Sequence, residues 1–197
     1  MKFFLRLKHW QLFLLLIGIP LILQILLMTA FITNSNPNLI LHVFQTMMFL
    51  MVVVYFGWYY ALGTNLYEKL PAGTPMSLIR FKIFLFIPAV YIVLVSLLML
   101  LVLPDFVSSE SGSFAPFALI FPIHIFSMYC IFYCLYFISK AMKTAEWQRQ
   151  VTFSDYAGEF FLFWFFPIGI WIIQPRINKL FEISEETPNI PGSPAAE

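Results

Sequence analysis

The chain has four long apolar stretches, and its basic residues occur only in every second segment that flanks or joins them. All eleven Lys and Arg lie before the first stretch, between the second and third, or after the fourth, and the other two gaps contain none. Basic residues beside a membrane-spanning helix stay on the cytoplasmic side, so this sorting predicts four spans with both termini in the cytoplasm. The basic residues are Lys2, Arg6, Lys8, Lys69, Arg80, Lys82, Lys140, Lys143, Arg149, Arg176 and Lys179.

The apolar stretches are long enough to cross a bilayer. A helix needs about 20 apolar residues to span a hydrocarbon core about 30 Å thick. Hydrophobic residues make up 61% of the chain and charged residues 11%, a balance that a water-soluble domain of 197 residues cannot bury. We therefore expect an all-α membrane protein built as a four-helix transmembrane bundle. The predicted spans are about 10–32, 39–62, 83–103 and 116–138.

We expect one domain and one tail. Residues 1–181 would form a single transmembrane domain, with residues 139–150 extending the fourth helix beyond the membrane. Residues 182–197 contain three Pro and four acidic residues, so we expect a disordered cytoplasmic tail there. In general layout the chain resembles small bacterial inner-membrane proteins, which implies the bacterial inner (cytoplasmic) membrane as its location.

A fifth apolar segment, residues 160–173, has only 14 residues, or about 21 Å as a helix. Pro167 removes the helical hydrogen bond to Phe163, and Gly169 follows, so the sequence predicts a break near these residues. If the segment crossed, the basic residues after it would be the only external ones. We therefore favour a re-entrant or interfacial segment over a short, tilted fifth span.

Charged residues flank this short segment on both sides. Asp155 and Glu159 precede it, and Arg176 and Lys179 follow it. If the segment folds back, these opposite charges would meet at the mouth of a hairpin and hold it at the cytoplasmic interface. Thr152 and Asp155 also fit the pattern of a helix-start capping box. The broken segment is the first candidate for a functional site, although an aromatic interfacial anchor is the slightly favoured interpretation.

Five polar side chains lie inside the predicted spans, in the outer half of the bilayer. Such groups are costly in hydrocarbon, so each needs a partner or a function. We favour a layer of interhelical hydrogen bonds over the lining of a pathway, because the four spans contain no Asp, Glu, Lys or Arg. The residues of this polar intramembrane layer are Gln24, His42, Gln45, Ser96 and His124.

No catalytic, cofactor-binding or phosphate-binding motif occurs in the sequence, so we expect no catalytic residue and no cofactor. Cys130 and Cys134 share a helix face, but His124 would point about 120° away from Cys130, and we expect no metal site. Gly57 and Ala61 form a small-x-x-x-small pattern that would serve internal packing or self-association equally well.

Three classes of function remain open. We favour a non-enzymatic inner-membrane protein that acts by assembly, as an accessory or regulatory subunit docking a cytoplasmic or membrane partner. The first alternative is a homo-oligomeric pore or channel. The second is a small membrane enzyme or lipid-handling protein that uses His42, His124 or the Asp155 and Glu159 pair. The expected partners are the lipid bilayer and either further copies of the chain or another protein, and not nucleic acid.

Overall fold

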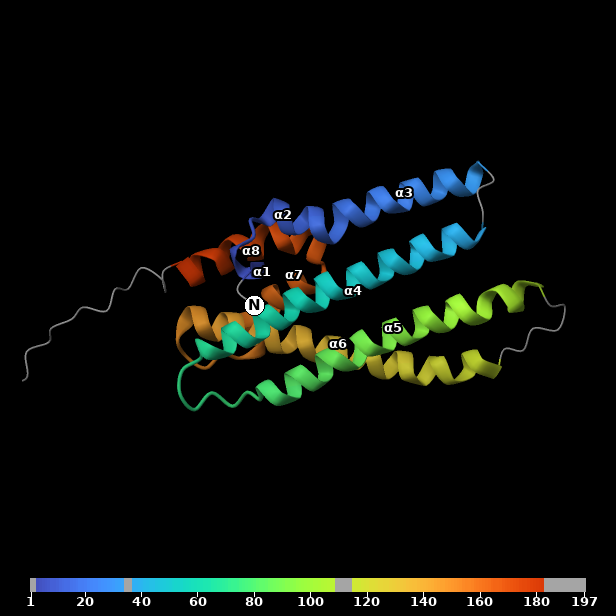
Figure 1. Cartoon of the computed structure of the whole chain (residues 1–197). Coiled ribbons are helices and arrows are strands. Elements are labelled where there is room, and N and C mark those ends of the chain that lie inside the picture. The colour runs from blue at the N-terminus through green and yellow to red at the C-terminus, as the bar shows by residue number, and fades with distance from the viewer. Residues whose placement is uncertain (1–2, 34–36, 109–114, 183–197) are drawn as a thin grey trace, which may run out of the picture.

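The computed structural model describes residues 3–33, 37–108 and 115–182, and the regular structure in these ranges is all helical, as predicted. Four long helical stretches run side by side, and a pair of shorter helices packs against one end of them (Figure 1). The elements are α1 (Phe3–Arg6), α2 (His9–Phe13), η1 (Leu14–Gly18), α3 (Ile19–Ile32), α4 (Pro37–Glu68), α5 (Leu78–Ser108), α6 (Ala115–Trp147), α7 (Phe153–Trp164) and α8 (Phe166–Glu182).

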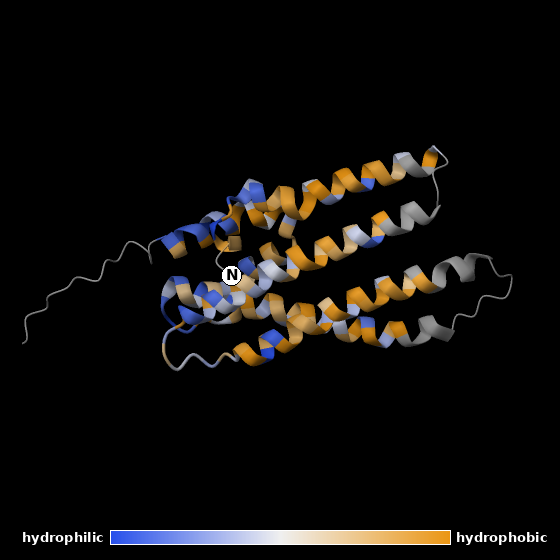
Figure 2. Ribbon diagram, viewed as in Figure 1, coloured by the Kyte–Doolittle hydropathy of each residue, from blue (hydrophilic) through white to orange (hydrophobic). Residues whose placement is uncertain are grey.

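Four helical stretches are long and apolar enough to cross a membrane, which agrees with the four spans expected from the sequence. They cover His9–Thr29, Val43–Glu68, Leu78–Met99 and Ile120–Trp147. Apolar residues cover the middle of these helices, and hydrophilic residues gather toward one end (Figure 2). At that end α4 and α6 continue past the predicted spans, through residues 63–68 and 139–147. The extension of α6 is rich in good helix formers such as Ala, Lys, Met and Glu.

The first candidate span is not a uniform α-helix. It begins at α2, passes through the π-helical turn η1 and continues as α3. The N–H of Ile19 bonds to the carbonyl of Leu14, five residues back, which defines the wide turn. Pro20 follows directly and has no N–H to donate, so a locally widened helix next to it is physically expected.

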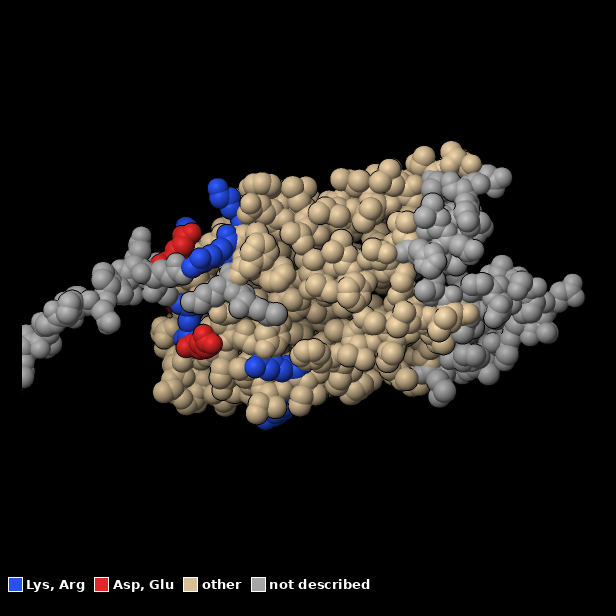
Figure 3. Space-filling model, viewed as in Figure 1, with Lys and Arg blue, Asp and Glu red and all other residues tan. Residues whose placement is uncertain are grey.

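The basic residues gather at one end of the molecule. On the face drawn in Figure 3, the Lys and Arg side chains lie at the end where α4 and α6 finish and α5 begins. Successive helices run in opposite directions, so their alternate ends come together there, and this end is called the basic end below. The predicted disordered tail covers residues 182–197; its first residue, Glu182, is the last residue of α8, and residues 183–197 lie outside the described ranges.

The four long helices do not contact one another equally. α4, α5 and α6 each pack against the other two, whereas the main contacts of α3 are with η1 and α4. α7 packs against α6 and α8, and α8 packs against α1 and α2. The pair α7–α8 therefore connects the fourth candidate span to the start of the first, at the basic end (Figure 1).

The largest buried side chains lie toward the basic end. More helices meet there than at the opposite end, where only α3 to α6 remain, so more apolar surface is covered. Small residues let these helices approach closely: a Cβ added at Gly57 would come 3.2 Å from the Phe4 ring, and one at Gly63 would overlap Phe81. The small residues of α4 thus face the chain's own aromatic rings. Fully buried core residues include Trp58, Tyr59, Phe81, Phe137, Phe163, Ile170, Ile173 and Ile177.

Candidate functional site

The chain reverses direction at Phe165, between α7 and α8. Phe165 leaves the helical conformation, with φ −90° and ψ 56°, while its N–H still bonds to the carbonyl of Phe161 at 2.8 Å. Its own carbonyl accepts the N–H groups of Ile168 and Gly169, at 3.1 and 2.9 Å. One residue thus ends α7 and satisfies two donors at the start of α8. We call α7 and α8 together the hairpin.

The predicted break occurs, but it lies two residues before Pro167. Pro167 is the second residue of α8, a position where the missing N–H would have no intrahelical partner in any case. Gly169 has a steric role, because a Cβ there would overlap the carbonyl oxygen of Leu162. Glycine therefore allows the first turn of α8 to lie directly against the last turn of α7.

Two tyrosines of α4 reach the turn of the hairpin. The Tyr55 hydroxyl donates to the Tyr59 hydroxyl at 2.8 Å, and the Tyr59 hydroxyl donates to the carbonyl of Phe163 at 3.2 Å. A continuous helix would have offered that carbonyl the N–H of residue 167, which proline lacks. Tyr59 replaces the missing donor. The sequence offered only a weak signal for this pair, namely two tyrosines one helical turn apart.

Four charged side chains meet where the hairpin packs against α6. The Arg176 guanidinium of α8 donates to both carboxylate oxygens of Glu146, at 3.0 and 2.6 Å, and to Glu159 of α7 at 2.7 Å. Lys143 of α6 donates to the same Glu159 oxygen at 2.9 Å. We call these four residues the charge cluster. It contains two positive and two negative groups, so it is neutral as a whole.

The charge cluster favours the ionised forms of Glu159 and Arg176. Burial disfavours the charged form of Glu159, but hydrogen bonds from Arg176 and Lys143 outweigh it and hold the pKa of this carboxyl below its usual value. Burial likewise opposes the charge on Arg176, yet Glu146 and Glu159 raise its pKa further. A proton exchanger at neutral pH would need a group that titrates there, and neither group is shifted toward neutrality.

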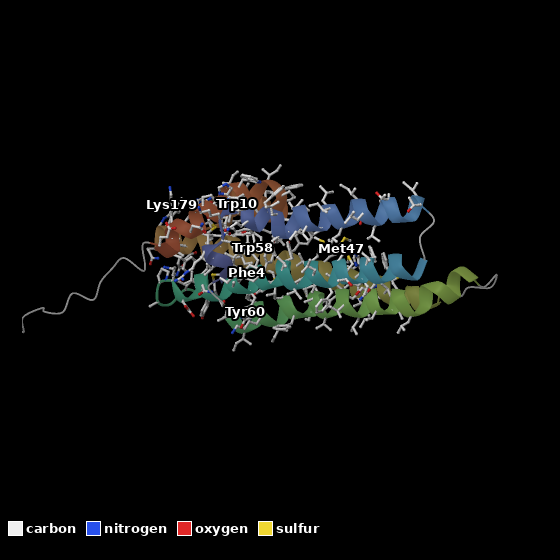
Figure 4. All side chains as sticks on the ribbon, turned by 45° about the horizontal axis from the view of Figure 1, so that its top comes forward. Phe4, Trp10, Met47, Trp58, Tyr60 and Lys179 are labelled. Carbon is white, nitrogen blue, oxygen red and sulfur yellow. The ribbon has the colours of Figure 1, made fainter. Side chains whose placement is uncertain are left out.

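The structure separates the four charges that the sequence grouped together. Glu159 and Arg176 do meet across the hairpin. Asp155 instead accepts the N–H of Thr152 at 2.8 Å and forms the expected capping box, which lowers its pKa. Lys179 is exposed and lies near the far tip of the basic end (Figure 4). Sequence reasoning missed Lys143 and Glu146, which lie on one face of α6 three residues apart and were read as part of a solvated extension.

The hairpin also holds the start of the chain. The side-chain amide of Gln174 donates to the carbonyls of Phe4 and Leu7, both at 2.9 Å, and the amide of Asn178 donates to Leu7 at 3.3 Å. These carbonyls come from the stretch where the chain changes from α1 to α2, so they have lost helical partners. Gln174 is completely buried. These hydrogen bonds attach α8 to the segment that joins α1 to α2.

The predicted polar layer divides into separate parts. Gln45 of α4 donates to Ser96 of α5 at 2.9 Å, as the packing interpretation requires. The ring of His124 on α6 bonds to the Tyr91 hydroxyl of α5 at 3.1 Å. Gln24 is exposed on α3 and makes no hydrogen bond to any part of the chain that the structure describes. The side chain of His42 lies outside the described part.

His124 does not converge with the cysteines. Its side chain is exposed, whereas Cys130 and Cys134 are buried, and the Cys134 thiol points toward the carbonyl of Phe81 at 4.0 Å. In the described ranges, no group of three or more His, Cys, Asp or Glu side chains is placed to hold a metal ion.

An apolar groove of about 840 Å³ runs along α5. Its α5 residues extend from Lys82 to Leu98, or about 24 Å of helix, and Ile120 and Ile123 of α6 complete it. The Lys82 ammonium lies at its basic end, 5.6 Å from the centroid of the Tyr60 ring of α4. The groove is thus apolar along its length and cationic at one end.

These arrangements indicate a supporting role for the hairpin. Its acids and bases neutralise one another, its polar amides hold backbone carbonyls, and its turn is stabilised by tyrosines of α4. This chemistry orders helices and leaves no activated nucleophile or general base among the residues described at the hairpin. No family model, curated protein or solved structure matches this chain.

Proposed function

We propose that the protein is a non-enzymatic integral membrane protein that acts by assembly, as an accessory or regulatory subunit. The four apolar helices support a membrane location, for which we propose the bacterial inner membrane, and the sorting of basic residues supports an orientation with both termini in the cytoplasm. The basic end then faces the cytoplasm. It is the end that carries most of the charged surface available to a partner (Figure 3).

In this orientation the hairpin is a re-entrant element. Its turn is apolar and exposed at Trp164, Phe165 and Ile168, so it would lie in the hydrocarbon of the cytoplasmic leaflet. Its mouth carries the charge cluster and would lie at the interface. The backbone groups freed at the turn are covered by α4 and by the turn's own hydrogen bonds, which is the condition for a helix break at membrane depth.

The charge cluster is the observation that carries the proposal. A catalytic or proton-relay site needs a group held ready to change its charge, whereas Lys143, Glu146, Glu159 and Arg176 are mutually paired. The pore alternative needs polar groups free to line a path, and Gln45 and Ser96 are bonded to each other. The favoured role is therefore a helical protein whose internal polar groups are paired and whose outer surface binds partners.

Mass spectrometry of the intact protein released from nanodiscs tests this proposal. Assembly predicts particles that contain more than one chain when the full-length protein is extracted from its native membrane. A matched variant, Lys179→Gln, removes an exposed charge outside the charge cluster and should leave assembly intact. Particles of one chain only, under every mild extraction condition, would contradict the proposal. Loss of a measurable reaction in Glu159→Gln with assembly and folding unchanged would favour an enzyme instead.

The α5 groove favours one second candidate, a lipid-binding role. A groove that is apolar over about 24 Å and ends at Lys82 fits an acyl chain with its anionic headgroup at the ammonium. Lys82→Gln should reduce retention of phosphatidylglycerol relative to phosphatidylcholine in nanodisc-released protein, and Lys179→Gln should not. Equal retention in wild type and Lys82→Gln would remove this candidate.

A further inference from the structure

Among the described residues of the candidate membrane spans, one carboxamide has no hydrogen-bond partner. Gln45 is bonded to Ser96, and the imidazole of His124 is bonded to Tyr91. Gln24 is exposed and unbonded within the described ranges. A glutamine amide in hydrocarbon without a partner is unfavourable by the desolvation of two donors and an acceptor, so its place on α3 calls for explanation.

Gln24 cannot avoid the hydrocarbon by reaching for water. It lies eight residues before Ile32, the last residue of α3, and therefore about 12 Å along the helix from that end. This distance exceeds the length of a glutamine side chain. The basic end is farther still, since Gln24 lies fifteen positions after His9, or about 22 Å along the helix.

The surface around Gln24 is also left uncovered by the rest of the chain. Leu21, Ile25 and Met28 surround it on one side of α3, and each is 55 to 58% exposed. The main contact of α3 with another long helix is with α4. Nothing described in the chain packs over this side, which we call the Gln24 face.

We propose that the Gln24 face is the contact between two copies of this chain, with the two Gln24 side chains bonded to each other. A carboxamide both donates and accepts, so it can pair with its own copy across a twofold axis. All copies cross the membrane in the same orientation, so a twofold axis along the membrane normal brings Gln24 to Gln24 at one depth. A different partner would need its own polar group at that depth.

This inference rests on the proposed function, because it names the partner through which the protein assembles. The proposed contact is not the small-x-x-x-small pattern of α4. The surfaces at Gly57 and Gly63 are already covered by Phe4 and Phe81 of the same chain. Polar pairing between membrane helices contributes to their affinity. From the range measured for such bonds, its loss should weaken dimerisation by roughly 3- to 30-fold.

Cysteine crosslinking gives the sharpest test. Gln24→Cys should form a disulfide-linked dimer in membrane vesicles under mild oxidation. Ile22→Cys is the matched control: Ile22 is 57% exposed at nearly the same depth, but it is rotated by about 200° around the helix. Cys130 and Cys134 are buried, so the wild-type chain serves as the background. Equal crosslinking at positions 22 and 24, or a crosslink from position 24 to a different protein, would overturn the proposal.

Substitution of the amide gives the second test. Gln24→Leu should weaken energy transfer between labelled copies in vesicles, with the dimerisation midpoint moving by roughly 3- to 30-fold in protein-to-lipid ratio. Gln24→Asn should retain pairing, and Gln45→Leu should leave the midpoint unchanged because its bond is internal. If wild type assembles and Gln24→Leu assembles equally well, only this inference fails. If wild type is a single chain with no partner, the proposed function fails with it.

Discussion

The Tyr59 hydroxyl donates a 3.2 Å hydrogen bond to the carbonyl of Phe163, the group for which Pro167 provides no N–H. A helix break inside a low-dielectric environment leaves backbone groups that must find partners elsewhere. Here a side chain of a long helix supplies the partner, and Tyr55 orients it by donating to its oxygen. The hydrogen bonding of the hairpin turn is therefore completed by α4.

We expect Tyr59→Phe to loosen the hairpin. The substitution leaves the Phe163 carbonyl buried without a donor, which should lower the free energy of opening by about 1 to 3 kcal/mol. Hydrogen exchange of residues 160–173, measured by mass spectrometry in nanodiscs, should accelerate accordingly. Tyr55→Phe is the control, because it keeps the Tyr59–Phe163 bond and should have a smaller effect. Equal acceleration in both variants would show that ring packing matters more than the hydroxyl.

The two glycines of the hairpin should respond oppositely to alanine. Gly169→Ala places a methyl group into the Leu162 carbonyl and should destabilise the hairpin by roughly 3 kcal/mol. Gly158→Ala adds a methyl group in open space within α7, so it should stabilise the helix by about 0.5 to 1 kcal/mol. Thermal unfolding followed by tryptophan fluorescence in detergent measures both. A tolerated Gly169→Ala would mean that α8 does not lie so close to α7.

Glu159 and Arg176 should be energetically coupled. Each loses a charge-assisted partner when the other is neutralised, so Glu159→Gln and Arg176→Gln should each cost roughly 1.5 to 3 kcal/mol. The double variant should cost less than the sum of the single ones, because each neutral residue relieves the unpaired charge left by the other. Denaturant unfolding of the three variants gives the coupling energy. Additive costs would show that the ion pair is not formed in the membrane.

The number of candidate spans followed from the sequence, because long apolar stretches have few other solutions in a chain of this composition. A break within residues 160–173 was also expected, and α7 gives way to α8 there. That the segment folds back without crossing stays a prediction, because it rests on the side of the membrane assigned to Arg176 and Lys179. Its turn was misplaced by two residues. The missing N–H of Pro167 indicated a break near this residue, whereas Pro167 occupies the start of the next helix, where proline is well tolerated.

The partners at the site could not be derived from the sequence. Glu146 and Lys143 are ordinary members of a polar helix extension until the hairpin is packed against them. The contacts of Gln174 join residues 170 positions apart in the chain, and no local pattern encodes such a contact. Within the polar layer, the sequence indicates the depth of each side chain but not its direction, and direction decides that Gln45 meets Ser96 while His124 meets Tyr91.

Acid should weaken the hairpin through Glu159. The pKa of this carboxyl is lower in the folded protein than its ordinary value of about 4.3, so the unfolded state takes up the proton first as the pH falls. The stabilisation is therefore complete above about pH 5 and is lost progressively as the pH falls through the folded pKa. Asp155 contributes with the same sign, since hydrogen bonds from Thr152 lower its pKa as well.

The contribution of Glu159 is isolated by comparing the pH dependence of unfolding in wild type and in Glu159→Gln, because Asp155 is present in both proteins. Between pH 5 and 3 the unfolding free energy of wild type should fall more steeply, by at most about 1.4 kcal/mol per pH unit for the one additional proton. At pH 7 wild type should be the more stable protein, and the two should converge in acid as Glu159 becomes neutral. If the unfolding free energies of the two proteins changed in parallel with pH over this range, Glu159 would not be held ionised by Arg176 and Lys143. The charge cluster would then behave as a set of exposed, screened charges.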